Sequence, residues 1–159
     1  MAGCARFSIA MAYLLDTCVV SELIRPAPEA RVLAFMEPLD PEACYLSALT
    51  VGELGRGIER MPASKRKETL KAWLHGQLLV TYADRIWPVD TDVAHCWAEL
   101  SAALEAVGRT LPLFDSLIAA TAVVHRAAIV TRNIQDFNAA GVSVVNPWDG
   151  YTLHPPTEI

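Results

Sequence analysis

Five short apolar runs interrupt the chain, at 11–15, 44–47, 86–89, 127–131 and 142–145. Runs of four or five apolar residues bounded by turn signals are typical of buried strands. Between the runs, apolar residues recur three and four positions apart, which predicts helices at 19–24, 29–36, 70–78, 93–107 and 115–124. Strands that alternate with helices predict an α/β sandwich with a mainly parallel central sheet.

The chain of 159 residues fits one domain, which we expect to occupy residues 11–150. Residues 1–10 are interpreted as an N-terminal extension before Met11, because the apolar stretch 7–10 is too short for a signal peptide. Residues 151–159 are expected to form a disordered C-terminal tail. No apolar run approaches the ~20 residues of a membrane span, so no membrane association is expected.

The net charge is -5 and the pI about 5.3, which argues against binding nucleic acid through bulk positive charge. The four cysteines are widely spaced and lie in apolar surroundings, which favours free thiols in the reducing cytoplasm. The four histidines have no spacing typical of zinc ligands. A site built from carboxylates fits this composition better.

Polar side chains stand where the predicted strands end. Asp16 follows the first run, and Glu53 lies about one helical turn beyond the second. Asp115 opens the helix before the fourth run, and Asn133 follows that run. Because the carboxyl ends of parallel strands meet at one edge of a sheet, we expect all four side chains to lie along that edge.

The three acids also have structural explanations. Asp16 suits the N-cap of the next helix, and Thr50 with Glu53 matches a capping box. Asp115 lies in a first helical turn, where the helix dipole favours negative charge. Each explanation is good for one residue, but together they leave the shared position at the strand ends unexplained.

Three carboxylates at close quarters raise one another's pKa unless a cation intervenes. An all-oxygen set favours Mg²⁺ or Mn²⁺, so we expect Asp16, Glu53 and Asp115 to be metal ligands. Such a metal lowers the pKa of a bound water and stabilises charge on a phosphate, which suits phosphodiester hydrolysis. A phosphatase with Asp16 as nucleophile is less favoured, because the second acid expected two residues on is Cys18.

Six of the 13 basic residues fall within positions 56–71: Arg56, Arg60, Lys65, Arg66, Lys67 and Lys71. A solvated helix face would explain them. They would equally form a phosphate-contacting patch on an otherwise acidic protein. On the second interpretation, Arg56, Arg60 and Lys65 are candidate RNA-binding residues.

Four fragments stand in order and at matching spacing: Leu14-Leu15-Asp16-Thr17 with Ser21-Glu22; Ser47, Thr50, Glu53, Leu54 and Gly57; Asp115 with Ile118-Ala119-Ala120-Thr121-Ala122; and Thr131-Arg132-Asn133 with Asp136-Phe137. With these fragments, and the ending Asn146-Pro147-Trp148, residues 11–149 resemble a PIN domain. The resemblance is greatest to the VapC-type toxins of bacterial toxin–antitoxin pairs, including their FitB-like branch.

The resemblance implies a PIN-like three-layer α/β/α sandwich and a metal-dependent endoribonuclease that cleaves single-stranded RNA. Asp16, Glu53, Asp115 and Asn133 match the family's catalytic positions, with Thr17 in support. The family also implies a homodimer inhibited by a VapB-like antitoxin whose tail fills the acidic site. Operator DNA would be reached only through that antitoxin.

Two positions depart from the family pattern. Cys18 stands where asparagine is usual, and Asn133 stands at the fourth acidic position, with Asp136 three residues on. We expect Asn133 to occupy the site and Asp136 to be structural, with Asp136 as the alternative fourth acid. Two other functions stay open: a PIN nuclease in RNA processing, and a FitB-like partner that acts mainly within an operator-binding complex.

Overall fold

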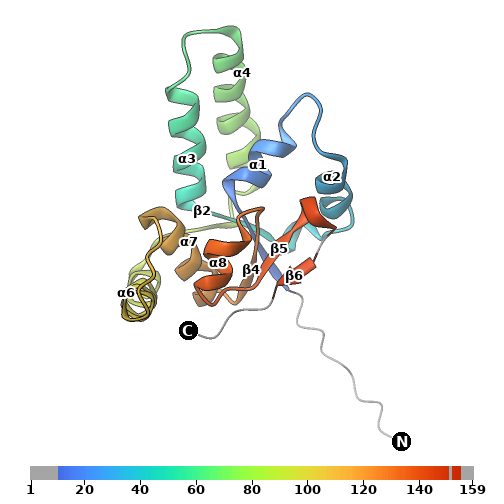
Figure 1. The fold of residues 1–159 in the computed structure, drawn as a ribbon. Helices are drawn as coiled ribbons and strands as arrows, with labels where there is room; N and C mark the ends of the chain where they lie inside the picture. The colour runs from blue at the N-terminus through green and yellow to red at the C-terminus, as the bar shows by residue number, and fades with distance from the viewer. Residues whose placement is uncertain (1–10, 151, 155–159) are drawn as a thin grey trace, which may run out of the picture.

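A six-stranded sheet in the order β3-β2-β1-β4-β5-β6 runs through the middle of the molecule (Figure 1). The computed structural model describes residues 11–150 and, for the backbone alone, residues 152–154. The strands are β1 Ala12–Leu15, β2 Cys44–Ser47, β3 Ile86–Trp87, β4 Ala127–Val130, β5 Val144–Asn146 and β6 Thr152–His154. The first five are parallel and β6 is antiparallel to β5. The mainly parallel sheet predicted from the sequence is therefore confirmed.

Helices connect the parallel strands. They are α1 Thr17–Leu23, α2 Ala30–Met36, α3 Ala48–Glu59, α4 Lys65–Trp73, α5 Leu79–Thr81, α6 Thr91–Ala106, α7 Leu113–Val124 and α8 Ile134–Ala139. A π-helical turn, Leu74–Leu78, joins α4 to α5. Short 3-10 turns occur at Pro41–Ala43 and Pro147–Asp149. In the described part of the chain, no helix is both long and apolar enough to cross a membrane.

The sheet separates two hydrophobic cores. Neighbouring residues of a strand point to opposite faces, so Leu14 packs with α6, α7 and α8, whereas Leu15 packs with α1, α2 and α3. Ile129 and Val130 of β4 divide between the two cores in the same way. Each face is thus covered by helices, and the predicted three-layer α/β/α sandwich is confirmed.

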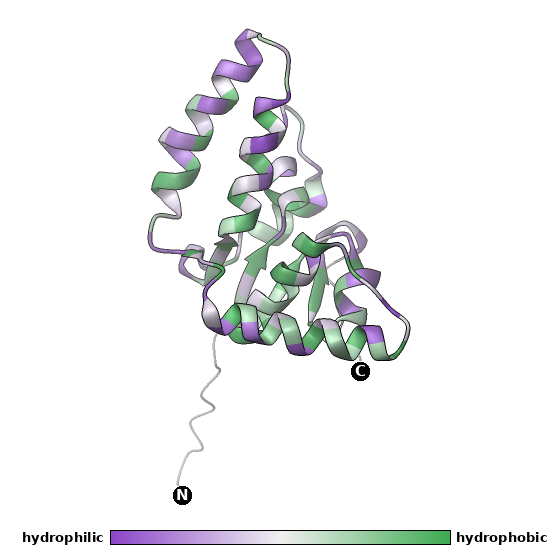
Figure 2. Cartoon of the chain, turned by 90° about the vertical axis from the view of Figure 1, so that its left-hand side faces the viewer, coloured by the Kyte–Doolittle hydropathy of each residue, from purple (hydrophilic) through white to green (hydrophobic). Residues whose placement is uncertain are grey.

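The α3–α4 pair projects away from the sheet, and its far end is hydrophilic (Figures 1 and 2). Near the sheet, Leu54, Ile58, Leu74 and Leu78 are buried in the core beside β1 and β2. Packing therefore fixes the base of the pair, and its outer part stands over the carboxyl ends of the strands.

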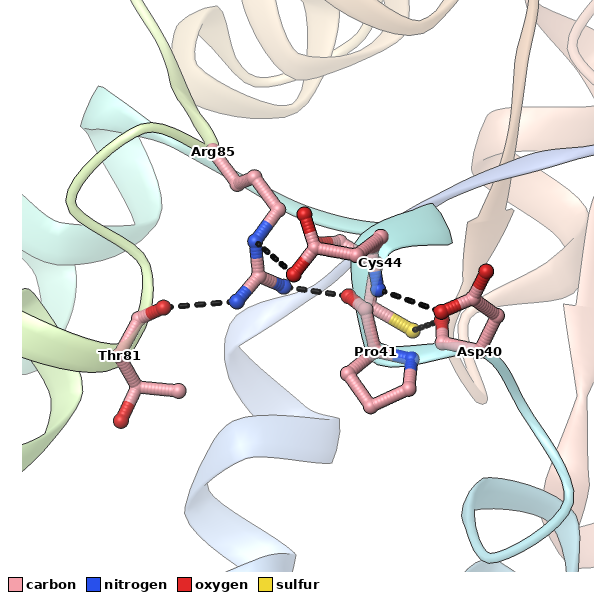
Figure 3. A network of polar contacts seen from close by, with 6 residues as sticks. Asp40, Pro41, Cys44, Thr81 and Arg85 are labelled. Carbon is pink, nitrogen blue, oxygen red and sulfur yellow. Dashed lines mark hydrogen bonds and ion pairs between the residues drawn. The ribbon is translucent and has the colours of Figure 1, made fainter.

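Arg85 ties the start of β2 to the segment before β3 (Figure 3). Its guanidinium donates to the carbonyl oxygens of Pro41, Cys44 (3.1 Å) and Thr81 (2.7 Å). These bonds connect the turn before β2, the first residue of β2 and the end of α5. They also hold β2 in place, and β2 leads directly into α3.

Several predicted boundaries differ from the structure. β3 ends at Trp87, because Pro88 has no N–H for a strand ladder. β5 begins at Val144 rather than at 142. The expectation of a tail without structure is wrong at Thr152–His154, which pairs with β5 as β6. The predicted extension 1–10 lies outside the described residues.

Candidate active site

A cleft of about 760 Å³ opens where β1 and β2 end, between α1, α3 and α4. Asp16, Glu53 and Asp115 all line it. The sequence predicted that these three acids would meet, and the structure brings them together. Next to them the cleft has an apolar wall from the α3–α4 pair, formed by Leu54, Ile58, Met61, Leu70 and Trp73.

Asp16 is both a helix cap and a residue of the cleft. Its Oδ1 accepts a hydrogen bond from the Thr17 backbone N–H (2.8 Å), as the N-cap of α1. Its Oδ2 accepts from the Thr131 hydroxyl (2.7 Å) and the Cys18 thiol (3.5 Å). The structural and the functional explanation of Asp16 are therefore compatible. Bonds from two elements fix the orientation of the carboxylate.

Glu53 is not part of a capping box, and that interpretation of Thr50 and Glu53 is wrong. The N-cap of α3 is Ser47, whose Oγ accepts from the Leu49 N–H (3.1 Å). The helix begins at once because Ser47 ends β2 and is itself a favourable cap. Thr50 is fully buried inside the helix. Glu53 instead accepts a hydrogen bond from the Thr17 hydroxyl at its Oε2 (2.5 Å).

Asp115 lies in the first turn of α7 and is half-buried. Burial, followed by the negative charges of Asp16, Glu53 and Asp136, raises its pKa from 3.8 to about 6. The increase occurs although the N-terminus of a helix favours a negative charge. Besides burial, the neighbouring carboxylates disfavour the charge of Asp115, which is the repulsion that the sequence predicted.

Thr131 is a site residue that the sequence analysis missed. It is fully buried directly after β4, donates its hydroxyl proton to Asp16 and accepts a hydrogen bond from the Asn133 N–H (3.0 Å). The signal was a hydroxyl at the end of a buried run, the same pattern that pointed to Asp16. Without the neighbouring strands in place, nothing indicated its partner.

Asn133 and Asp136 lie together beside the site. The Asn133 Nδ2 donates to Asp136 Oδ2 (3.0 Å), and neither residue lines the cleft itself. The charge of Asp136 is near enough to raise the pKa of Asp115. Phe137, next to Asp136, is fully buried. Which of Asn133 and Asp136 completes the site stays a prediction.

The predicted RNA-binding residues Arg56, Arg60 and Lys65 are exposed on the α3–α4 pair and do not line the cleft. Two other members of the basic cluster, Lys67 and Lys71, pair with Glu59. The cations that line the cleft are Arg25, Arg66 and Arg132. Only Arg66 among them belongs to the basic cluster noted in the sequence.

The donors of the cleft have the chemistry of a hard-cation site. Asp16, Glu53 and Asp115 offer carboxylate oxygens, and a cation would relieve the repulsion that raises the pKa of Asp115. Within the part of the chain that the structure describes, no three His, Cys, Asp or Glu side chains form a ready-made ligand set. The donor types fit Mg²⁺ or Mn²⁺, and their side chains would have to close around the ion.

Comparison with protein families gives a match to the PIN domain over residues 13–142. The chain belongs to the PIN domain family. The resemblance recognised in the sequence is thereby confirmed, and so is the fold it implied.

Two relatives and one solved structure are similar to this PIN domain over nearly their whole length. The VapC ribonuclease Y4jK of Sinorhizobium fredii is 40% identical over 136 residues, which are 86% of this chain and 97% of that protein. Toxin FitB of Neisseria gonorrhoeae is 41% identical over 135 residues, covering 85% and 97%. The structure of FitAB bound to an IR36 DNA fragment aligns with a TM-score of 0.81 at 39% identity, covering 86% and 95%.

Proposed function

We propose that this PIN domain is a VapC-type toxin, a metal-dependent endoribonuclease that hydrolyses phosphodiester bonds of single-stranded RNA. The observation that carries the proposal is the convergence of Asp16, Glu53 and Asp115 on one cleft, with the pKa of Asp115 raised by burial and by the neighbouring acids. The similarity to a VapC ribonuclease and to toxin FitB supports the same activity.

In this proposal Asp16, Glu53 and Asp115 hold Mg²⁺ or Mn²⁺. When bound, the metal would activate water for attack and stabilise the charge that develops on the phosphate. The protein keeps the carboxylates ready for it: Thr131 orients Asp16 and Thr17 orients Glu53. Asp115 must release its proton before it can bind a cation, and a pKa of about 6 allows this near neutral pH.

Asn133 is proposed to orient a phosphate oxygen through its amide, since a neutral side chain binds a metal more weakly than a carboxylate. Asp136, to which it donates, contributes negative charge near Asp115. Asp136 is therefore retained as the alternative fourth acid.

The proposed partner is a cognate VapB-like antitoxin. The acids and the apolar wall lie side by side in one cleft, which suits a peptide with both basic and apolar side chains. The structure of FitAB bound to a DNA fragment supports a DNA-binding complex, and the net charge of -5 on this chain favours contact with operator DNA through the antitoxin. Leu113, Phe114 and Val123 are exposed apolar residues of α7, which supports the proposed homodimer.

We place the protein in the cytoplasm. Cys18, Cys44 and Cys96 are free thiols, which favours a reducing compartment.

The test is cleavage of a mixed pool of single-stranded RNA with Mg²⁺, with Mn²⁺ and with chelator, followed by sequencing of the new ends. We expect new ends only when a metal is present. Asp16→Asn should abolish them in a folded protein, because asparagine is also a good N-cap and preserves α1. Cleavage that persists in chelator, or at the wild-type rate in the variant, would contradict the proposal.

A second role is supported by the similarity to FitB in its DNA-bound complex: participation in an operator-binding complex. RNA cleavage by the wild type, measured beside DNA binding by one variant, separates the two roles. If DNA binding is the main role, Asp16→Asn together with the antitoxin should bind operator DNA as the wild type does, and the wild type should cleave no RNA. Metal-dependent cleavage by the wild type would establish the enzyme.

A further inference from the structure

Arg132 is one of three arginines that line the cleft beside its carboxylates. It follows Thr131, whose hydroxyl bonds to Asp16, and its own side chain lines the cleft. Its guanidinium carbon lies 5.1 Å from the centre of the Trp148 ring, within the range of a cation–π contact. Among the described residues, no carboxylate forms a salt bridge with it.

Among the described residues, no side-chain hydrogen bond uses the donors of Arg132 either, in contrast to those of Arg25. The Arg25 guanidinium donates to Glu22 at 3.0 Å. Glu22 is itself buried and also accepts the Glu29 N–H at 2.9 Å, so its charge is already compensated. Arg132 acts on Glu22 only through its field, which lowers the pKa of Glu22 further. The guanidinium of Arg132 thus remains open to a ligand.

Hydrogen bonds and packing hold the residue beneath Arg132, Trp148, in place. The backbone N–H of Trp148 donates to the side-chain oxygen of the buried Asn146 (2.9 Å). The backbone carbonyl of Trp148 accepts from the Arg31 guanidinium (2.9 Å). The ring also packs against the core that contains Leu15. A planar cation held over a fixed ring loses less conformational entropy when it binds an anion than a free lysine would.

We propose that Arg132 binds a backbone phosphate of single-stranded RNA next to the bond that is cleaved, as a residue that positions the substrate. The proposal rests on the proposed ribonuclease function and assigns it a substrate contact. A guanidinium pairs with a phosphate through two parallel hydrogen bonds. Placed beside three carboxylates, it would offset their repulsion of the RNA where the strand enters the acidic end of the cleft. Arg56, Arg60 and Lys65 lie outside the cleft.

The experiment measures binding of a fluorescent single-stranded oligoribonucleotide to the full chain in chelator, where no metal-dependent cleavage occurs. Arg132→Gln should raise the Kd by about tenfold or more, the effect expected for losing a charge-assisted pair. It should also reduce the slope of log K against log salt concentration by about 0.7, the value for one phosphate contact on a single strand. Arg132→Lys keeps the positive charge but cannot form the two parallel hydrogen bonds of a guanidinium. Its Kd should lie between those of the wild type and of Arg132→Gln.

The matched control is Arg109→Gln, which removes one exposed positive charge outside the cleft. Its Kd should stay within about twofold of the wild type, because it loses no phosphate contact.

Equal affinities for the Arg132 and Arg109 variants would overturn the proposal while leaving the ribonuclease function intact. It would also be overturned if Arg132→Gln weakened only the complex with the antitoxin, since the guanidinium would then serve protein carboxylates. A wild type that neither binds nor cleaves RNA would remove the proposed function as well.

Discussion

Replacing Asp115 with asparagine is expected to stabilise the metal-free protein at neutral pH while impairing its activity. The pKa of Asp115 is higher in the folded protein than in the unfolded chain, because burial and three neighbouring carboxylates disfavour its charge. The folded state therefore holds its proton more tightly, and stability falls as the pH rises from about 4 through about 6. Asparagine has no proton to lose and avoids this fall.

The size of the effect follows from the pKa. A rise from 3.8 to about 6 corresponds to at most about 3 kcal/mol. Asp115 is half-exposed, so solvent screening reduces this to roughly 1–2 kcal/mol. The variant also loses the favourable charge at the start of α7, worth about 0.3–1 kcal/mol. The net gain at pH 7.5 is then about 1 kcal/mol, or about 2–4 °C in Tm for a chain of this size.

The assay is thermal unfolding of wild type and Asp115→Asn in chelator at several pH values between 4 and 7.5. The difference in Tm should be largest at pH 7.5 and should disappear towards pH 4, where the wild-type carboxyl is protonated in both states. Added Mg²⁺ should raise the Tm of the wild type more than that of the variant. A variant that is less stable at pH 7.5, or a difference that does not change with pH, would refute the reasoning.

Three further predictions concern the side chains around Asp115. Glu53→Gln still accepts the threonine hydroxyl, so unfolding experiments should show a change below about 1 kcal/mol, whereas RNA cleavage should fall by about 100-fold or more; a large loss of Tm with full activity would contradict this. Thr131→Val removes the hydrogen bond to Asp16 and should lower the free energy of unfolding by about 1–3 kcal/mol and reduce RNA cleavage. Thr131→Ser should restore both, and a valine variant with normal activity would exclude the orienting role. Asp136→Asn should lower the pKa of Asp115, as followed by NMR titration of its carboxyl group, and an unchanged titration would mean that the two side chains do not interact.

The elements of this fold could be predicted because their signals are local. The alternation at Leu14 and Leu15 and the cap at Asp16 depend on residues within one turn or one strand. The sharing of one sheet edge by Asp16, Glu53 and Asp115 followed from a general rule of parallel sheets. Hydrophobic pattern and strand polarity were thus enough to find the three acids of the cleft.

The partners of those acids could not be predicted, because they depend on the order of the strands. β1 lies between β2 and β4, an arrangement that no local pattern specifies. It brings Thr17 to Glu53 across 36 positions of sequence and Thr131 to Asp16 across 115. The choice of N-cap for α3 likewise depended on where β2 ends. Ser47, the last residue of β2, caps the helix, whereas Thr50 is buried inside it.

The sequence by itself determined most of the strands and helices and the acids at the strand ends, because periodicity and capping act over a few residues. Only the tertiary structure decided which cations belong to the cleft. Arg132 is a single basic residue in its stretch of sequence, whereas the visible cluster at 56–71 lies mostly outside the cleft. Proximity in a folded chain is set by packing of the two cores against the sheet, and a cluster in sequence is not a cluster in space.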